Sequence, residues 1–292
     1  MLRPHQFPLQ IVKRSHAPFD GDDCLFEIKH DGFRVIAIRD AGSTRLFTRN
    51  GYDISRMHQH IIASLSALAA ERFVLDGELV VLDDDGRSNF GKLMFGRTGT
   101  HYFAFDLLML DSTDLRPLPL ESRNERLREL LQSSDDPVRY CDHVTDRGKD
   151  FFDLVRATGL EGMVAKRRRS PYLGRPTDDW LKIKCLRTHD FIVGGWLRGE
   201  TDRDVCALLL GEFFGDALRY LGTVRVGVGF GRYTWREIAR GLIPQERSPF
   251  ADTIPDRDAR FCAPSLRVPI EFAEFTGDGH LRRPALNRFT EF

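Results

Sequence analysis

Lysine is scarce in this chain: seven lysines stand against 36 arginines among 292 residues, and none follows Lys184. Cysteine is scarce too. The five cysteines are scattered and form no C-x-x-C pair, which argues against structural zinc and against a disulfide framework. No apolar run approaches the roughly 20 residues of a membrane span, and residues 1–10 show no signal-peptide pattern. These absences predict a cytoplasmic protein with reduced thiols and no membrane partner.

The overall composition is that of a soluble globular protein. Hydrophobic residues make up 41% and charged residues 29% of the chain, and its length suits two modest domains or one large one. The formal net charge is zero, so any affinity for nucleic acid must come from local patches and not from a global field. Lys166-Arg167-Arg168-Arg169 is the clearest basic patch. A solvated surface without a ligand is the alternative interpretation of this run.

The apolar patterning predicts an α+β fold built on antiparallel sheet, without the regular alternation of a doubly wound fold. Strands are expected within residues 24–49, 73–82, 102–110, 163–166 and 180–184. Helices are expected over residues 55–71, 89–95, 120–131 and 149–157.

Near Thr188 the pattern changes to strand-like segments separated by Gly-rich turns. They cover residues 191–197, 205–213, 218–225 and 268–276, and residues 234–242 form one expected helix. About five strands and one helix fit an OB-fold β-barrel, although other small barrels fit this pattern equally well. We therefore predict one domain over residues 1–187 and a second over residues 188–292, with a hinge at residues 185–190.

The segment from Glu27 to Arg34, Glu-Ile-Lys-His-Asp-Gly-Phe-Arg, is the most informative part of the chain. Lys29 ends an alternating strand and precedes an Asp-Gly turn. A lysine amine is a poor nucleophile at its usual pKa of about 10.4, but burial beside other cations favours the neutral, reactive form. Arg34 can hold a phosphate or a ribose. A hairpin with a surface lysine is the alternative for these residues alone.

Six segments of the chain follow one another in an order that resembles the covalent nucleotidyltransferases, which include ATP-dependent DNA ligases, RNA ligases and mRNA capping enzymes. They are Lys-x-Asp-Gly-x-Arg at residues 29–34 and the segments at residues 48–51, 75–80, 103–108, 161–166 and 180–184. Six such matches in order over about 155 residues leave little room for chance. The likeness is greatest to the ligase domain of bacterial end-joining ligases, and residues 272–276 and 281–284 also resemble those ligases.

The resemblance implies an ATP-dependent DNA ligase for DNA repair, with an adenylation (nucleotidyltransferase, ATP-grasp-like) domain followed by a C-terminal OB-fold. Lys29 would attack the α-phosphate of ATP, and the AMP would pass from Lys29 to the 5′-phosphate of nicked or broken duplex DNA. The 3′-hydroxyl would then close the strand. The resemblance also implies Mg²⁺, with Mn²⁺ as a substitute, a monomeric enzyme, and an end-binding or repair protein as a candidate partner.

The same resemblance assigns roles to individual residues. The catalytic residues are Lys29, Lys182 and Lys184. The nucleotide-binding residues are Glu27, Arg34, Arg49, Glu78, Phe105, Lys182 and Lys184. Glu78 and Glu161 would bind the metal, and Lys166, Arg167, Arg168 and Arg169 would bind DNA.

Several of these residues also have ordinary structural explanations. Lys182 and Lys184 share one face of a strand, so their amines repel each other unless an anion lies between them or solvent surrounds them. Phe105 could be a core residue, Arg49 a turn residue, and Glu78 a partner in a strand-edge salt bridge.

One motif of the family is not matched. The family closes with Arg-x-Asp-Lys, whereas this chain reads Arg-Phe-Thr-Glu-Phe at residues 288–292, with Thr290 at the arginine position. We therefore expect either that Arg282 or Arg283 substitutes or that self-adenylation is slow.

Two alternative functions remain. An RNA ligase or capping-type nucleotidyltransferase would share Lys29 and most of the motifs. A non-catalytic nucleic-acid-binding relative belongs to a different class, and the altered tail is compatible with it.

Overall fold

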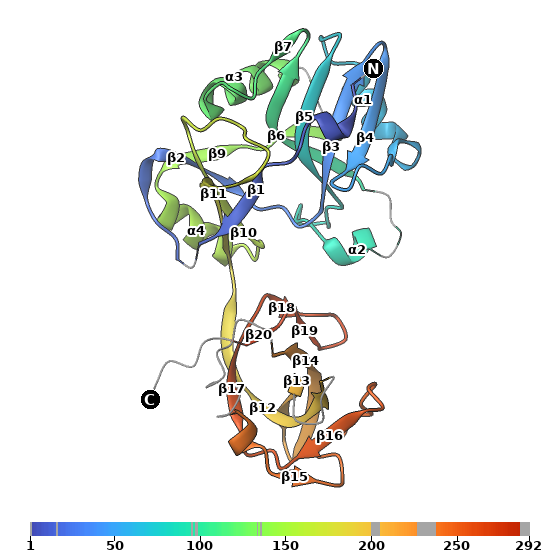
Figure 1. The fold of residues 1–292 in the computed structure, drawn as a ribbon, viewed down its shortest axis with the longest axis vertical. Coiled ribbons are helices and arrows are strands. Elements are labelled where there is room, and N and C mark those ends of the chain that lie inside the picture. Colours follow the sequence, from blue (N-terminus) through green and yellow to red (C-terminus); the bar gives the residue numbers. More distant parts are fainter. Residues whose placement is uncertain are drawn as a thin grey trace. The chain divides into compact units, whose positions relative to one another are not determined.

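The computed structural model describes residues 2–15, 17–94, 96, 99–132, 134, 136–199, 205–226 and 238–286. The chain divides into two compact units, Met1–Cys185 and Leu186–Phe292 (Figure 1). This division falls two residues before the boundary that the sequence predicts. Among the described residues, no helix has the length and apolar character needed to cross a membrane.

The first unit contains two sheets. The six-stranded sheet has the order β4-β3-β5-β6-β7, with β8 beside β6, and all of its ladders are antiparallel except β6–β8. Its strands are β3 (Phe33–Asp40), β4 (Ser43–Thr48), β5 (Phe73–Val80), β6 (His101–Leu110), β7 (Thr113–Asp114) and β8 (Val138–Tyr140).

The five-stranded sheet has the order β1-β11-β10-β2-β9. Its strands are β1 (Ile11–Arg14), β2 (Gly21–Ile28), β9 (His143–Asp146), β10 (Gly162–Arg167) and β11 (Pro176–Lys184). Val164 pairs with Glu27 on one side and with Lys182 on the other. The sheet therefore makes neighbours of the first, fifth and sixth nucleotidyltransferase-like segments.

The helices of the first unit are short. They are α1 (Gln59–Ser66), α2 (Phe90–Met94), α3 (Leu120–Leu131) and α4 (Gly148–Ala157), with 3-10 turns at Pro4–Gln6 and Ser55–Met57. The sequence prediction for α3 is confirmed, but the helix expected over residues 55–71 is too long. Ser55 does not cap α1, because its hydroxyl donates to Asp53 (2.5 Å) and accepts from the Leu46 amide (2.9 Å).

Both faces of the six-stranded sheet are buried. Alternate residues of a strand point to opposite sides, so each strand contributes side chains to both faces. One face packs with α1 and α3 and includes Val35, Ala37, Leu75, Leu107, Ile61, Leu65 and Leu127. The other face packs against Trp180 and Tyr172 and includes Ile36, Ile38, Val74 and Leu108. Side chains of the two sheets thus meet around Trp180, and the candidate site lies there.

The second unit is mostly sheet. Its strands are β12 (Arg187–Arg198), β13 (Val205–Phe214), β14 (Ala217–Arg225), β15 (Pro244–Gln245), β16 (Ala259–Cys262), β17 (Arg267–Phe272) and β20 (Ala285–Leu286), with a separate hairpin of β18 (Glu274–Phe275) and β19 (Leu281–Arg282). The strand expected over residues 268–276 is therefore two strands. Residues 238–241 are helical, and the start of the helix expected over residues 234–242 lies outside the described residues.

The sheet of the second unit is open within the described part of the chain, so the closed barrel that the sequence predicts is not found there. β12 pairs along one edge with β17 over its first half and with β16 over residues 195–197. Its register against β13 shifts between Val193 and Gly195. This one long, irregular strand holds the neighbouring strands together, and the ladders end at β14, β15 and β20 without closing a ring.

Candidate active site

A cavity of about 250 Å³ lies in the first unit and is lined by strands of both its sheets. Eight of the predicted site residues line it: Glu27, Lys29, Arg34, Arg49, Glu78, Phe105, Lys166 and Lys182. The wall formed by residues 9–12, together with His30 and Trp180, was not predicted. No motif marks residues 9–12, because their place in the cavity depends on the parallel pairing of β1 with β11.

Lys29 lies at the end of β2 and forms an ion pair with Glu161, which directly precedes β10. The distance from Nζ to Oε2 is 2.5 Å, and the other carboxylate oxygen lies 3.2 Å from Nζ of Lys184. The Lys29 amide also donates to the carbonyl of Gly162 at 2.9 Å. Glu161 thus provides a negative charge between two of the predicted catalytic lysines.

Glycines in two of the motifs allow the chain to pack closely here. A Cβ on Gly32 would lie 2.2 Å from the Leu79 carbonyl oxygen, and a Cβ on Gly162 would lie 2.2 Å from that of Ile183. Gly162 also has a φ of +151°, which side chains disfavour. These positions hold the backbone beside Lys29 and Glu161 in place.

Lys182 adds a third amine to the cluster. Its pKa is lowered, first by partial burial and then by the positive charges of Lys184 and Lys29. Lys29 and Lys182 line the cavity, and Lys184 shares the Glu161 carboxylate with Lys29, so positive charge gathers here in a chain of zero net charge. A polyphosphate would relieve their mutual repulsion.

Glu78 lies on β5, opposite Arg34 on β3. Burial raises the pKa of its carboxyl group to about 8, and the charges of Lys29 and Arg34 only partly oppose this effect. Glu78 and Glu161 offer the hard oxygen ligands that Mg²⁺ prefers, and Mg²⁺ is often held by one or two carboxylates together with substrate phosphates. Among the described residues, no group of three or more metal-ligating side chains occurs.

Lys166 and Glu27 form a buried ion pair with a distance of 2.6 Å between Nζ and Oε2, and their side chains are 2% and 3% exposed. The Lys166 amine also lies 4.5 Å from the ring centre of Phe105 and 4.2 Å from that of Trp180. Burial raises the pKa of Glu27 to about 7, and Lys166 opposes this shift. The prediction that Lys166 contacts DNA is therefore wrong, because strand alternation directs its side chain into the protein.

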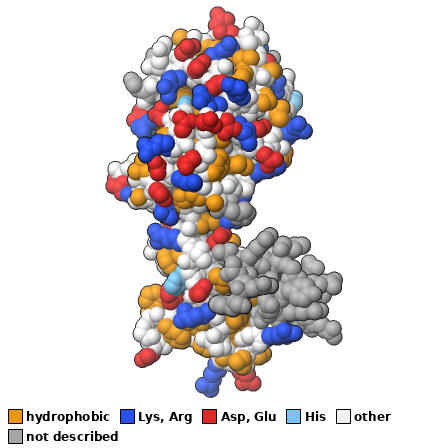
Figure 2. Space-filling model, turned by 90° about the vertical axis from the view of Figure 1, so that its left-hand side faces the viewer, with side chains coloured by type: hydrophobic (Ala, Val, Ile, Leu, Met, Phe, Trp, Pro, Cys, Tyr) orange, Lys and Arg blue, Asp and Glu red, His pale blue; other side chains and the backbone are white. Residues whose placement is uncertain are grey.

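The three arginines that follow Lys166 remain near the surface. Arg167 is exposed and forms an ion pair with Asp23, and Arg168 forms an ion pair with Glu121 at 3.1 Å. Arg169 is exposed. On the face shown in Figure 2, basic and acidic side chains are interspersed over the first unit. Of the four residues in the predicted basic patch, only these three arginines lie near the surface.

Arg34 and Phe105 occupy the wall of the cavity. Arg34 makes a two-pronged ion pair with Asp76, at 3.0 and 2.6 Å, and donates to the Gln10 carbonyl at 2.6 Å. Its guanidinium carbon lies 5.4 Å from the ring centre of Phe105. Most of its donors are thus engaged within the protein, whereas Arg49 is exposed at the cavity lining.

Comparison with known protein families agrees with this arrangement. The family model described as ATP dependent DNA ligase domain matches residues 8–184, and the model described as ATP dependent DNA ligase C terminal region matches residues 201–291. The chain therefore belongs to the ATP-dependent DNA ligase family, which confirms the resemblance seen in the sequence.

Individual relatives are similar over most of this chain. The multifunctional non-homologous end joining protein LigD of Pseudomonas aeruginosa is 34% identical over 281 residues, which cover 91% of this chain and 33% of that protein. The crystal structure of the ligase domain of M. tuberculosis LigD is 29% identical, with a TM-score of 0.60, and covers 97% of this chain and 94% of that one. A structure of mycobacterial DNA ligase D complexed with ATP and MES is 27% identical, also with a TM-score of 0.60, over 96% and 94% of the two chains. The chain spans about a third of the length of the curated LigD relatives it matches.

Proposed function

We propose that this chain joins 5′-phosphate and 3′-hydroxyl ends of DNA in an ATP-dependent reaction through a lysyl-AMP intermediate. The observation that carries the proposal is the position of Lys29, whose amine lies at the cavity within 2.5 Å of Glu161. The relatives named for non-homologous end joining favour a role at broken ends over a role confined to isolated nicks.

In the first step, Nζ of Lys29 attacks the α-phosphorus of ATP. The nitrogen–phosphorus bond forms as the bond to the β-phosphate oxygen breaks, and pyrophosphate leaves. Glu161 is within hydrogen-bond distance of Nζ and can accept the proton that the amine must lose. Lys182 and Lys184 place positive charge where the phosphates carry negative charge.

Glu78 and Glu161 would hold Mg²⁺ together with the phosphates of ATP. When bound, the metal would neutralise phosphate charge and stabilise the leaving pyrophosphate. Arg49, exposed at the cavity lining, would contact the phosphates or the ribose.

The purine would lie against Phe105, between the walls of the cavity. Two buried polar atoms without a hydrogen-bond partner belong to residues that line this cavity, Oε1 of Glu27 and Nε1 of Trp180. One is an acceptor and the other a donor, so both could pair with the edge of a base. This arrangement supports binding of a nucleotide by its base as well as by its phosphates.

In the later steps, AMP passes from Lys29 to a 5′-phosphate, and the 3′-hydroxyl displaces it. We assign the adenylation steps to residues 1–187 and a role in DNA binding to residues 188–292, with Arg167, Arg168 and Arg169 as further DNA contacts. Arg282 already pairs with Glu274 at 2.5 Å, and residues 288–292 lie outside the described residues. The sequence predicts that Arg282 or Arg283 takes the role of the arginine missing from the C-terminal motif. To test this, the rate of lysyl-AMP formation is compared with the rate of closure of pre-adenylated nicks in wild type, Arg282→Ala and Arg283→Ala.

Intact-mass measurement after incubation with ATP and Mg²⁺ tests the proposal. We expect an added AMP on the wild type and on Lys13→Ala, but none on Lys29→Ala. Lys13 is a suitable control because it pairs with Asp178 at 2.8 Å and is 43% exposed. An adduct that persists in Lys29→Ala would refute the assignment.

Two further comparisons separate the alternatives. An adduct from GTP in preference to ATP would favour a capping-type enzyme, and preference for nicked RNA over nicked DNA would favour an RNA ligase. A wild type that takes up neither nucleotide would favour a non-catalytic relative.

A further inference from the structure

Tyr172 lies in the loop between β10 and β11, outside all six of the nucleotidyltransferase-like segments, yet it contacts several of them. Its side chain is buried, and its hydroxyl donates to Oδ2 of Asp76 at 2.7 Å and accepts from the amide of Gln10 at 3.0 Å. Nη2 of Arg34 lies 3.4 Å from the same hydroxyl. One oxygen atom thus links the N-terminal segment, β3 and β5.

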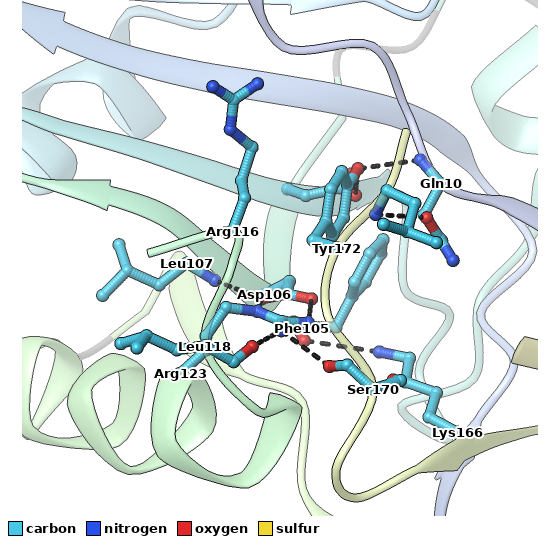
Figure 3. A network of polar contacts seen from close by, with 12 residues as sticks. Gln10, Phe105, Asp106, Leu107, Arg116, Leu118, Arg123, Lys166, Ser170 and Tyr172 are labelled. Carbon is cyan, nitrogen blue, oxygen red and sulfur yellow. Dashed lines mark hydrogen bonds and ion pairs between the residues drawn. The ribbon is translucent and has the colours of Figure 1, made fainter. Parts of the chain in front are cut away.

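The Tyr172 ring makes further contacts behind the cavity. It meets Trp180 edge-on, with ring centres 5.8 Å apart, and the guanidinium carbon of Arg123 lies 5.8 Å from its centre. Arg123 in turn donates to the carbonyl of Ser170, in the same loop, at 2.9 Å. Figure 3 shows Tyr172 between Gln10 on one side and the Arg123 network on the other.

Tyr172 itself does not line the cavity, whereas Gln10, Arg34 and Trp180 do. The Gln10 side chain is anchored to the same loop, because its Oε1 accepts from the amides of Leu173 and Gly174 at 2.9 and 3.0 Å. The loop therefore contacts two parts of the lining, the segment of residues 9–12 through Gln10 and Trp180 through Tyr172.

We propose that Tyr172 is a positioning residue for nucleotide binding, which acts by fixing Gln10, Arg34 and Trp180 relative to one another. This inference rests on the proposed function, since it takes ATP as the ligand of the cavity. A buried donor that loses its partner is costly, so without the hydroxyl the Gln10 amide must move to find another acceptor. The Tyr172 hydroxyl contacts Gln10, Arg34 and Asp76, whereas the Lys29 amine is paired with Glu161. Loss of the hydroxyl should therefore weaken binding and leave the chemical step intact.

The test compares ATP binding and lysyl-AMP formation in Tyr172→Phe and in wild type. We expect the dissociation constant for ATP, measured by calorimetry without divalent metal, to rise about tenfold. The KM for ATP in lysyl-AMP formation should rise by a similar factor, while the rate at saturating ATP stays within about twofold. Gln10→Ala removes the side-chain anchor to the loop and should also raise the dissociation constant and the KM for ATP. It replaces Tyr172→Phe in the test if that variant does not fold.

Tyr102→Phe is the matched control. Tyr102 is fully buried in the same unit, and its hydroxyl donates to the carbonyls of Val35 (3.1 Å) and Leu75 (3.2 Å), away from the cavity. We expect it to lower the melting temperature without changing ATP affinity. An unchanged ATP affinity in Tyr172→Phe, or an equal loss in Tyr102→Phe, would overturn the inference. A wild type that binds ATP but forms no lysyl-AMP would instead count against the proposed function, and the calorimetric comparison would still decide the role of Tyr172.

Discussion

The two units of this chain differ in what they bury. In the described residues, every buried polar or charged side chain belongs to the first unit: Gln10, Glu27, Asp31, Asp40, Thr44, His58, Asp76, Asp106, Arg123, Asn124, Lys166 and Ser170. The core of the second unit, as far as it is described, consists of aliphatic and aromatic residues and Cys262. The same chain thus builds one core from hydrophobic contacts alone and another that includes ion pairs.

Burying a charge is costly unless it is paired and hydrogen-bonded, and a hydrophobic replacement is often at least as stable. Three ion pairs with a buried carboxylate nevertheless surround the cavity or lie directly behind it: Glu27–Lys166, Arg34–Asp76 and Arg123–Asp106. Fold stability alone does not explain this arrangement. We infer that the first unit retains these pairs because they fix the polar atoms of the nucleotide site.

The largest expected effect is on stability, at the fully buried pair of Arg123 and Asp106. Arg123 contacts both carboxylate oxygens, at 2.7 and 2.8 Å, and neither side chain is exposed. Arg123→Met leaves the buried Asp106 carboxylate without a positively charged partner, with only the Leu107 amide, among the described residues, donating to it at 2.9 Å, and should lower the free energy of unfolding by about 3–5 kcal/mol. Urea unfolding measures this loss.

Two controls sharpen this comparison between the units. Adding Asp106→Leu to Arg123→Met should restore much of the stability, because no unpaired charge then remains. Leu208→Ala, in the apolar core of the second unit, should cost about 3 kcal/mol through the cavity that it creates. A double variant no more stable than Arg123→Met would show that the pair stabilises the fold by more than charge compensation.

A smaller effect, which depends on pH, is expected at Glu78. Burial raises its pKa to about 8, so the folded protein keeps a proton there over a pH range in which the unfolded chain has lost it. Its contribution to stability is present at low pH and is lost as the pH rises through about 8. Glu78→Gln cannot ionise, so its melting temperature relative to wild type should increase between about pH 5 and about pH 9. A difference in melting temperature that stays constant across this pH range would show that burial does not keep the Glu78 carboxyl group protonated.

The smallest effect is expected at the surface, on DNA binding. Arg169 is exposed, whereas Arg167 is paired with Asp23. Arg169→Ala should weaken DNA binding a few-fold and reduce the slope of log affinity against log salt by about one. Arg167→Ala should have less effect, and neither variant should change lysyl-AMP formation. Equal slopes in Arg169→Ala and wild type would remove Arg169 from the DNA interface.

The sequence predicted the centre of the site better than its surroundings. Lys29, Glu78, Phe105 and Lys182 were identified from motifs and do line one cavity. Tyr172 was not, because a tyrosine in a loop carries no periodic or motif signal, and its role depends on partners more than 90 residues away in the chain.

Predictions about elements succeeded where the signal is local. α3 was predicted correctly because its buried leucines recur at helical spacing. The helix over residues 55–71 starts later than predicted because the Ser55 side chain bonds to Asp53 and β4 instead of capping the helix, and it ends earlier, at Ser66. The closed barrel predicted for the second unit was not found in its described part. Closure depends on which strands pair, and the apolar pattern of a short strand does not specify its partner.

The sequence by itself determined which candidate groups this protein has for chemistry: Lys29 as the proposed nucleophile, two carboxylates and two further lysines, in motifs that identify the family. The tertiary structure decided which charges face the cavity and which are neutralised inside. Lys166 shows the difference, because four consecutive basic residues look like one surface until strand alternation buries the first of them beside Glu27. The physical reason is that the cost of a charge depends on its surroundings, and those are set by residues distant in the sequence.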